Sequence, residues 1–202
     1  MNILAHLYLS GKDEEIIVGN FIGDFVKGNQ IRKYAENIST GVRLHREIDH
    51  FTDGHPLVKK TNNYFRSKYG KHSGIVTDII FDHYLSNNWS KFSTDKFNFF
   101  IQSMYKILNR NLKKFPFGVI EFYPIMIINN WLNLYSTLPG LERVLKGMSN
   151  RTSLPAEYKY AISQIKTHYY EIDEIFVDFF YQIIDHVSTK FNIQIDLPGK
   201  EK

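Results

Sequence analysis

The 202-residue sequence contains no cysteine. This absence excludes disulfide bonds and thiolate-bound metals, so any metal must be held by His, Asp, Glu or Asn side chains. Long hydrophobic runs are also absent, because the most apolar stretch, residues 117–132, is interrupted by a glutamate, a proline and two asparagines. A membrane-spanning helix needs about 18 uninterrupted apolar residues, and the first ten residues carry no basic leader. We therefore expect a cytoplasmic protein without a signal peptide or membrane insertion.

Several enzyme signatures are missing. The sequence contains no GxSxG elbow, no Walker loop and no GxGxxG, so neither a nucleophilic serine nor a nucleotide cradle is supported. Residues 47–50 match the Glu-x-x-His of di-iron bundles, but that template needs a second copy, which this sequence does not contain. The net charge of +4 is a mild excess. It is compatible with an acidic protein, a nucleic acid or a phosphorylated substrate and does not choose among them.

The helical period runs through almost every segment, and no segment shows sustained strand alternation. With 43% hydrophobic residues, the chain can bury a core, and its length predicts a single all-α domain. We expect this domain to cover residues 1–190, followed by a polar tail at 191–202. The apolar segment 122–138 is expected to cross the core. The expected helices are residues 2–9, 14–26, 39–54 with Ser39 as N-cap, 57–69, 75–89, 93–109, 122–138, 141–148 and 156–187.

Four apolar segments each carry two polar residues at a spacing of four, which places both on one helical face. A buried carboxylate needs a partner or a metal, and repeated imidazole and carboxylate groups suit a hard or borderline divalent cation. The sequence therefore predicts a metal site. The four pairs are Asn2/His6, Asn20/Asp24, His45/Asp49 and Asp78/Asp82, and the predicted ligands are Asp24, His45, Asp49, Asp78, Asp82 and His83.

Other polar residues leave alternatives open. His6 is either a hydrogen-bonded core histidine or part of the site, and Asp53 is explained by helix termination before Gly54. Arginine offers a planar donor fork for phosphate oxygens, which makes Arg46 and Arg151 candidates, with surface ion pairing as the alternative. Trp131 and Tyr135 share a helical face. We expect these side chains to pack in the core, and the alternative is that they line a substrate site.

The order of these segments resembles the acyl carrier protein phosphodiesterases, also called acyl carrier protein hydrolases. The resemblance rests on MNILAHLYLS, GNFIGDFVKG, HREIDHFTD and DIIFDHYLSNNWS, followed by WLNLY and VLKGMSNR. It extends to about residue 151 and is weaker afterwards. The positions that it covers are His6, Asn20, Asp24, His45, Arg46, Asp49, Asp78, Asp82, His83, Trp89 and Arg151.

The resemblance implies hydrolysis of the phosphodiester that joins 4'-phosphopantetheine to a serine of holo-acyl carrier protein. It also implies a manganese (Mn²⁺) cofactor and an HD-like helical bundle, although HD proteins have adjacent His-Asp where this chain has Asp82 before His83. A metal would activate water, and His83 or His6 would be the general acid. The implied catalytic residues are Asp24, His45, Asp78, His83 and His6, and the implied substrate-binding residues are Asn20, Arg46 and Arg151.

Two alternatives to this function stay open. One is an HD-like phosphohydrolase that acts on a small nucleotide, and the other is a non-catalytic helical module that binds carrier proteins. Holo-acyl carrier protein is the expected partner, nucleic acid is not expected, and the oligomeric state is left open. An acidic carrier could be steered by the basic outer face of residues 57–69, which carries Lys59, Lys60, Arg66 and Lys68.

Overall fold

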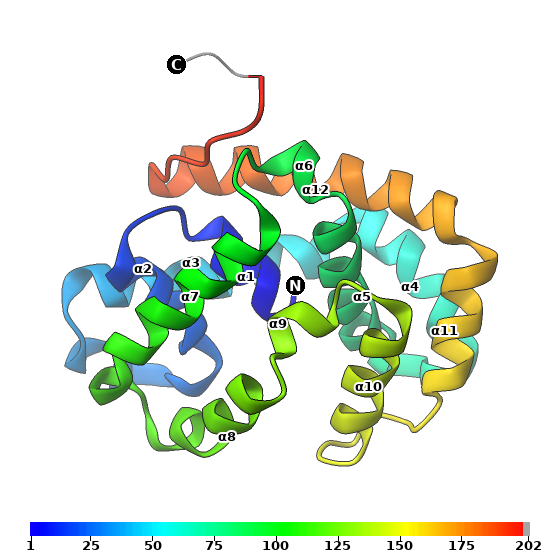
Figure 1. The fold of residues 1–202 in the computed structure, drawn as a ribbon, viewed down its shortest axis with the longest axis horizontal. Coiled ribbons are helices and arrows are strands. Elements are labelled where there is room, and N and C mark those ends of the chain that lie inside the picture. Colours follow the sequence, from blue (N-terminus) through cyan, green and yellow to red (C-terminus); the bar gives the residue numbers. More distant parts are fainter. Residues whose placement is uncertain (200–202) are drawn as a thin grey trace.

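The structure, a computed structural model, describes residues 1–199. Within this range it contains helices and no strands (Figure 1), so the predicted all-α, single-domain fold is confirmed. The α-helices are α1 (Ile3–Leu9), α2 (Glu14–Phe21), α3 (Glu36–Gly54), α4 (Pro56–Tyr69), α5 (Ser73–Asn87), α6 (Trp89–Phe92), α7 (Phe97–Arg110), α8 (Phe117–Ile128), α9 (Trp131–Leu134), α10 (Leu138–Ser149), α11 (Tyr158–Thr167) and α12 (Tyr169–Phe191). Short 3₁₀ helices are η1 (Gly23–Phe25), η2 (Gly28–Lys33), η3 (Gly70–His72) and η4 (Leu112–Lys114).

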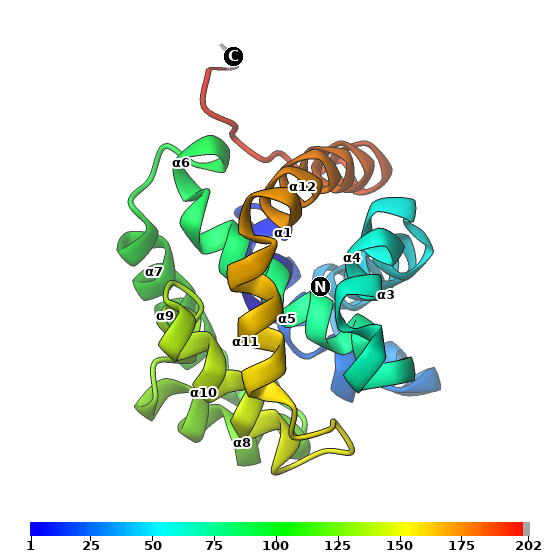
Figure 2. The ribbon, with the colours of Figure 1, turned by 90° about the vertical axis from the view of Figure 1, so that its right-hand side faces the viewer.

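Helix α5 lies at the centre of the fold. Its residues are apolar nearly all round, which is typical of a helix buried on every side; Ile79, Phe81 and Leu85 are fully buried. It packs against α1, α4, α10 and α12, and Figure 2 shows it near the middle of the molecule. The core-crossing helix is therefore α5.

The prediction that one helix over residues 122–138 crosses the core is wrong. The chain forms α8, turns, and continues as the short α9 before α10 begins. Asn130 at the turn has a left-handed backbone with φ of 46°, a conformation that Asn tolerates better than most residues. Helix α8 lies at the surface, with Phe117 75% and Ile128 82% exposed. One face of α8 lines a cleft, described below, through Phe122 and Ile125.

Three other expected boundaries also change. Ser39 lies inside α3, which follows Ala35, and its hydroxyl donates to the carbonyl oxygen of Ile31 instead of capping the helix. The helix expected over 14–26 ends at residue 21 and gives way to η1. The long final helix is divided at His168 into α11 and α12, which lets Tyr169 pack on Tyr84 of α5.

The C-terminal segment leaves α12 at Phe191. Ile193 is buried near Gly11, and Asp196 accepts a hydrogen bond from Lys12, so part of the predicted tail contacts the helical body. Residues 200–202 of that tail lie outside the described residues, and the boundary at 190 stays a prediction. No helix within residues 1–199 combines the length and apolar character that crossing a membrane requires.

The closest helix pair is α2 and α3, which cross at two glycines. A Cβ atom on Gly19 would lie 2.0 Å from the carbonyl oxygen of Ile38, and one on Gly41 would lie 2.2 Å from that of Ile16. Only glycine permits this backbone approach. The crossing therefore fixes α2 and α3 against each other, and both helices carry residues of the site described below.

We predict that Gly41→Ala destabilises the fold by about 1–3 kcal/mol, because its Cβ would push the two helix backbones apart. The matched control is Gly54→Ala, whose Cβ would meet nothing within 4 Å and whose stability should stay within about 1 kcal/mol of wild type. Urea denaturation followed by circular dichroism measures both. Equal midpoints for the two variants would contradict the role of the crossing.

Candidate metal centre

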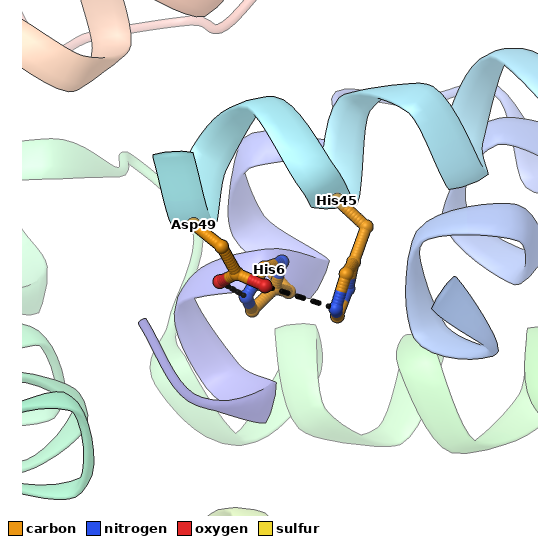
Figure 3. Close-up of side chains that lie close together, drawn as sticks. All are labelled: His6, His45 and Asp49. Carbon is orange, nitrogen blue, oxygen red and sulfur yellow. Dashed lines mark hydrogen bonds and ion pairs between the residues drawn. The ribbon is translucent and has the colours of Figure 1, made fainter. Parts of the chain in front are cut away.

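Three side chains from two helices meet in the structure: His6 of α1 and His45 and Asp49 of α3 (Figure 3). The Nε2 atom of His6 lies 3.1 Å from Oδ1 of Asp49, and the Nε2 atom of His45 lies 3.2 Å from Oδ2 of the same carboxylate. The two imidazole rings stack with their centroids 4.2 Å apart. One ligand atom from each side chain lies within 4.8 Å of the others. These residues form a candidate metal centre.

Asn20 orients both histidines. Its side-chain oxygen lies 2.8 Å from Nδ1 of His6, and its main-chain oxygen lies 2.9 Å from Nδ1 of His45. The side-chain nitrogen donates to the carbonyl oxygen of His6 and to Ser10 Oγ, which fixes the amide with its oxygen toward His6. Both Nδ1 atoms therefore donate, and both Nε2 atoms face Asp49. This arrangement of partners around ligating histidines is common at metal sites.

Asp24 borders the cluster on its open side. Its Oδ1 atom lies 3.2 Å from His45 Nε2, and the side chain is 76% exposed. The preceding Gly23 packs flat against His45, because a Cβ there would lie 2.3 Å from the imidazole Cγ. The chain thus leaves room for the imidazole and brings a second carboxylate to its edge.

The electrostatics of the cluster differ between its two histidines. Burial lowers the pKa of His6, and the adjacent His45 acts in the same direction. Burial also opposes the charge of His45, but hydrogen bonds and charges from Asp24 and Asp49 outweigh it and raise its pKa to about 9. Against the effect of burial, hydrogen bonds from both histidines hold the pKa of Asp49 well below its usual range. At neutral pH His45 carries a proton that a metal would have to replace.

The donor set fits a divalent cation. Two imidazole nitrogens and a carboxylate are presented to a common point, and Asp24 supplies further oxygen atoms beside it. Borderline divalent metals such as Mn²⁺, Fe²⁺ and Zn²⁺ accept this mixture of nitrogen and oxygen ligands. This fit rests on the Nε2 atoms of His6 and His45, which the hydrogen bonds at Nδ1 hold in position.

The other predicted ligands lie elsewhere. Asp78 Oδ1 lies 2.9 Å from the α-amino nitrogen of Met1, which also lies 3.7 Å from Asp49, so Asp78 is joined to the cluster only through that amine. Asp82 is fully buried and accepts hydrogen bonds from the backbone N–H groups of Leu4 and Ala5 at 2.8 and 3.1 Å. These groups belong to the first turn of α1, so Asp82 holds that helix in place.

His83 contacts a different part of the fold. It is 2% exposed, and its Nδ1 atom donates to the carbonyl oxygen of Tyr135 at 2.6 Å. The adjacent Asp82 and His83 therefore serve two different contacts and do not form a joint ligand pair. We leave Asp78, Asp82 and His83 out of the ligand set that we propose.

The cluster lies at one side of a cleft with a volume of about 780 Å³. Figure 1 shows the helices around it, with α8 and α10 on opposite sides of the lower half of the molecule and α1 above them. Lining residues from the N-terminal helices are Met1, Asn2, Ile3, His6, Asn20, Phe21, Asp24, Phe25, His45 and Asp49. The facing walls include Gly118, Glu121, Phe122, Ile125, Asn129, Trp131, Leu134, Tyr135, Arg143, Val144, Gly147, Met148, Arg151 and Thr152.

The two arginines predicted to bind substrate lie in different places. Arg151 lines the cleft, whereas Arg46 donates to the carbonyl oxygen of Val26 and does not. Arg143 is a cleft residue that sequence reasoning missed. No spacing signal marks it, because Arg151 lies beyond the end of α10 at Ser149, where helical periodicity no longer relates the two arginines. The basic face of α4 contributes no residue to the cleft.

Comparisons with known proteins identify the family of this chain. The sequence model of the family described as acyl carrier protein phosphodiesterase matches residues 1–183. The chain belongs to this family. It is 33% identical to the acyl carrier protein phosphodiesterase of Photorhabdus laumondii over 191 residues, which cover 94% of this chain and 96% of the relative. It is 32% identical to that of Yersinia enterocolitica, with 94% and 99% covered. No solved structure gives a significant match, so the HD-like relationship stays a prediction.

We predict that Asn20→Ala lowers the affinity of the protein for Mn²⁺ by about 10–100-fold, because His6 would lose the partner that orients its Nε2 atom. Isothermal titration of the chelated protein with MnCl₂ measures the affinity. If Asn20 binds substrate, as the sequence suggested, the variant would instead keep its Mn²⁺ affinity and show only a raised KM.

We also predict that Mn²⁺ binding at pH 7 releases about one proton, which comes from His45, because its pKa is raised to about 9 and ligation needs the neutral ring. Titrations in buffers with different ionisation enthalpies count the protons. The released number should fall toward zero, and the affinity should rise, as the pH approaches and passes 9. A binding enthalpy that is the same in every buffer at pH 7 would rule this out.

Proposed function

We propose that this chain is a metal-dependent phosphodiesterase that hydrolyses holo-acyl carrier protein to apo-carrier and 4'-phosphopantetheine. The observation that carries the proposal is the preorganised His6, His45 and Asp49 cluster at a large cleft, in a chain of this family. Mn²⁺ is the proposed cofactor, held by these three side chains with Asp24 beside them. The proposed setting is cytoplasmic.

The cleft suits a substrate in which one bulky group and one slender group are attached to the same phosphorus. The reacting phosphorus joins a serine of a folded protein to a flexible arm, and a folded protein cannot enter a cleft of about 780 Å³. The carrier must therefore stay at the mouth, with the phosphodiester at the cluster and the arm inside. Because the serine is bonded directly to the phosphate, carrier contacts must include the cleft rim. The α4 basic face lines no part of the cleft, and we propose no steering role for it.

The reaction adds water across the P–O bond: a water oxygen bonds to phosphorus, and the serine oxygen leaves and takes up a proton. A divalent cation in the cluster supplies Lewis-acid polarisation of the phosphoryl oxygen and activation of the water. Asn20 accepts hydrogen bonds from both Nδ1 atoms, so the Nε2 atoms are the ones that would hold the cation. Asp24, exposed beside them, would orient the attacking water by accepting its hydrogen bond. Arg143 and Arg151 line the same cleft and add positive charge that attracts the anionic substrate into it.

This assignment changes the expected general acid. His6 is used as a ligand, and His83 is buried and outside the residues that line the cleft. Neither is placed to protonate the leaving serine oxygen. We propose that this proton comes from solvent at the open mouth.

We predict that the chelated enzyme removes the 4'-phosphopantetheine mass from holo-acyl carrier protein only after Mn²⁺ is restored. Asp24→Ala and His45→Ala should lower kcat/KM by at least about 100-fold, because each removes a group at the reacting centre. Intact-protein mass spectrometry of the carrier measures turnover.

The control variant is Asp185→Asn, an exposed carboxylate on α12, which should keep wild-type activity. No mass loss by the wild type with any divalent metal would reject the carrier substrate and favour a small phosphodiester. Carrier binding that survives chelation, without turnover under any metal, would favour the non-catalytic module.

A further inference from the structure

Four planar side-chain groups lie in a row along the cleft wall, each one against the next. Phe25 stacks on Phe122 with centroids 5.5 Å apart and an interplanar angle of 17°. Phe122 stacks on Trp131 with centroids 6.4 Å apart and an angle of 27°, and the guanidinium of Arg151 lies 5.9 Å above the Trp131 ring. All four residues line the cleft. We refer to Phe25, Phe122, Trp131 and Arg151 as the aromatic ladder.

The aromatic ladder includes a residue next to the metal centre in the chain, because Phe25 follows Asp24. Phe122 belongs to α8, Trp131 begins α9, and Arg151 follows the end of α10. The four groups come from four separate segments of the chain, so the row is a product of the tertiary structure. It links the segment that carries Asp24 with the facing wall of the cleft.

Core packing accounts for only part of the ladder, although Phe122 and Trp131 pack against the core. Phe21, which tilts against Phe122, is 7% exposed, whereas Phe25 is 38% exposed, and Phe122 and Trp131 are half-buried. Within residues 1–199, neither Arg151 nor its neighbour in the cleft, Arg143, makes an ion pair with a carboxylate. The ladder therefore presents partly exposed ring edges to the cleft interior, together with the Arg151 guanidinium, which pairs with no carboxylate within residues 1–199.

Gly118 shows that this wall is fitted closely. A Cβ at this position would lie 2.7 Å from the Phe25 ring, and Gly118 itself lines the cleft. The glycine allows α8 to approach η1 closely enough for Phe122 to reach Phe25. The stacking of the first two rings thus depends on a residue without a side chain.

We propose that the aromatic ladder is the binding wall for the pantetheine arm of the substrate. This inference rests on the proposed function and extends it, because it assigns the arm to a particular row of side chains. The arm is a slender chain with a gem-dimethyl group near the phosphate and two amides beyond it. Methyl groups pack against aromatic carbon, and the Arg151 guanidinium donates hydrogen bonds to amide carbonyl oxygens.

The ladder should therefore determine selectivity for substrates that carry the arm. We predict that Trp131→Ala lowers kcat/KM for holo-acyl carrier protein about tenfold more than it lowers kcat/KM for bis(4-nitrophenyl) phosphate, which has no arm. The tenfold figure corresponds to about 1.4 kcal/mol, the size of one aromatic contact. Trp131→Phe keeps a stacking ring and should recover most of the loss.

The matched control is Phe99→Ala. Phe99 is 60% exposed on α7 and has a lysine, Lys96, 5.9 Å from its ring centroid, so the change also removes a ring beside a cation, but outside the cleft. It should leave both substrates at wild-type rates. Parallel losses on both substrates in Trp131→Ala, or no loss on the carrier, would overturn the inference.

A second measurement uses pantetheine alone and does not depend on turnover or on the folding of Trp131→Ala. The chain has two tryptophans, and Trp89 is 6% exposed with its indole N–H donated to the carbonyl oxygen of Asp95. Pantetheine should therefore cause a saturable change in the fluorescence of Trp131, absent in Trp131→Phe. 2-Mercaptoethanol controls for quenching by the thiol.

The two hypotheses fail in different ways. If the wild-type enzyme does not act on holo-carrier, the proposed function fails. The fluorescence titration with pantetheine then remains as the test of whether the ladder binds the arm. If the wild type is active but pantetheine gives no saturable signal, or gives the same signal in Trp131→Phe, the ladder is not the binding wall.

Discussion

The close crossing of α2 and α3 is the constraint on which the rest of the site depends. Two facing glycines, Gly19 and Gly41, let the helix backbones touch, and the residue after Gly19 is Asn20. From that position its two oxygen atoms reach one histidine of α1 and one of α3. A single asparagine thereby sets the tautomer and direction of both imidazoles. A side chain at either glycine would separate the helices and move Asn20 away from at least one of them.

The cleft joins two parts of the chain with different chemistry. The N-terminal helices supply two buried imidazoles and a partly exposed carboxylate, held by hydrogen bonds, as candidate ligands. The wall from α8 to α10 supplies aromatic edges and arginines that are partly exposed. This division matches a reaction at a phosphodiester with a slender apolar arm on one side. On α8, Phe122 and Ile125 line the cleft, whereas the exposed Phe117 and Ile128 lie outside its lining.

The spacing of four located side chains on helical faces, but it could not identify what each face meets. For His45 and Asp49 the facing groups are His6 and Asp24, and a candidate metal centre results. For Asp82 the facing groups are the backbone N–H groups of Leu4 and Ala5, so the same pattern produces a structural contact. A buried carboxylate needs a partner, and Asp82 has one. The partner in this case was a helix terminus, which has no signature in the sequence of α5.

The sequence by itself determined the all-α class and the nitrogen and oxygen character of any metal site, because periodicity and the absence of cysteine are local or compositional properties. It also carried the family resemblance. Only the tertiary structure decided which carboxylates converge, that α5 and not residues 122–138 crosses the core, and that Arg143 faces the cleft. The aromatic ladder belongs to this second group, since its members stand up to 126 positions apart in the chain (Phe25 to Arg151). Helical periodicity orders residues within one helix, whereas packing between helices places them in a common site.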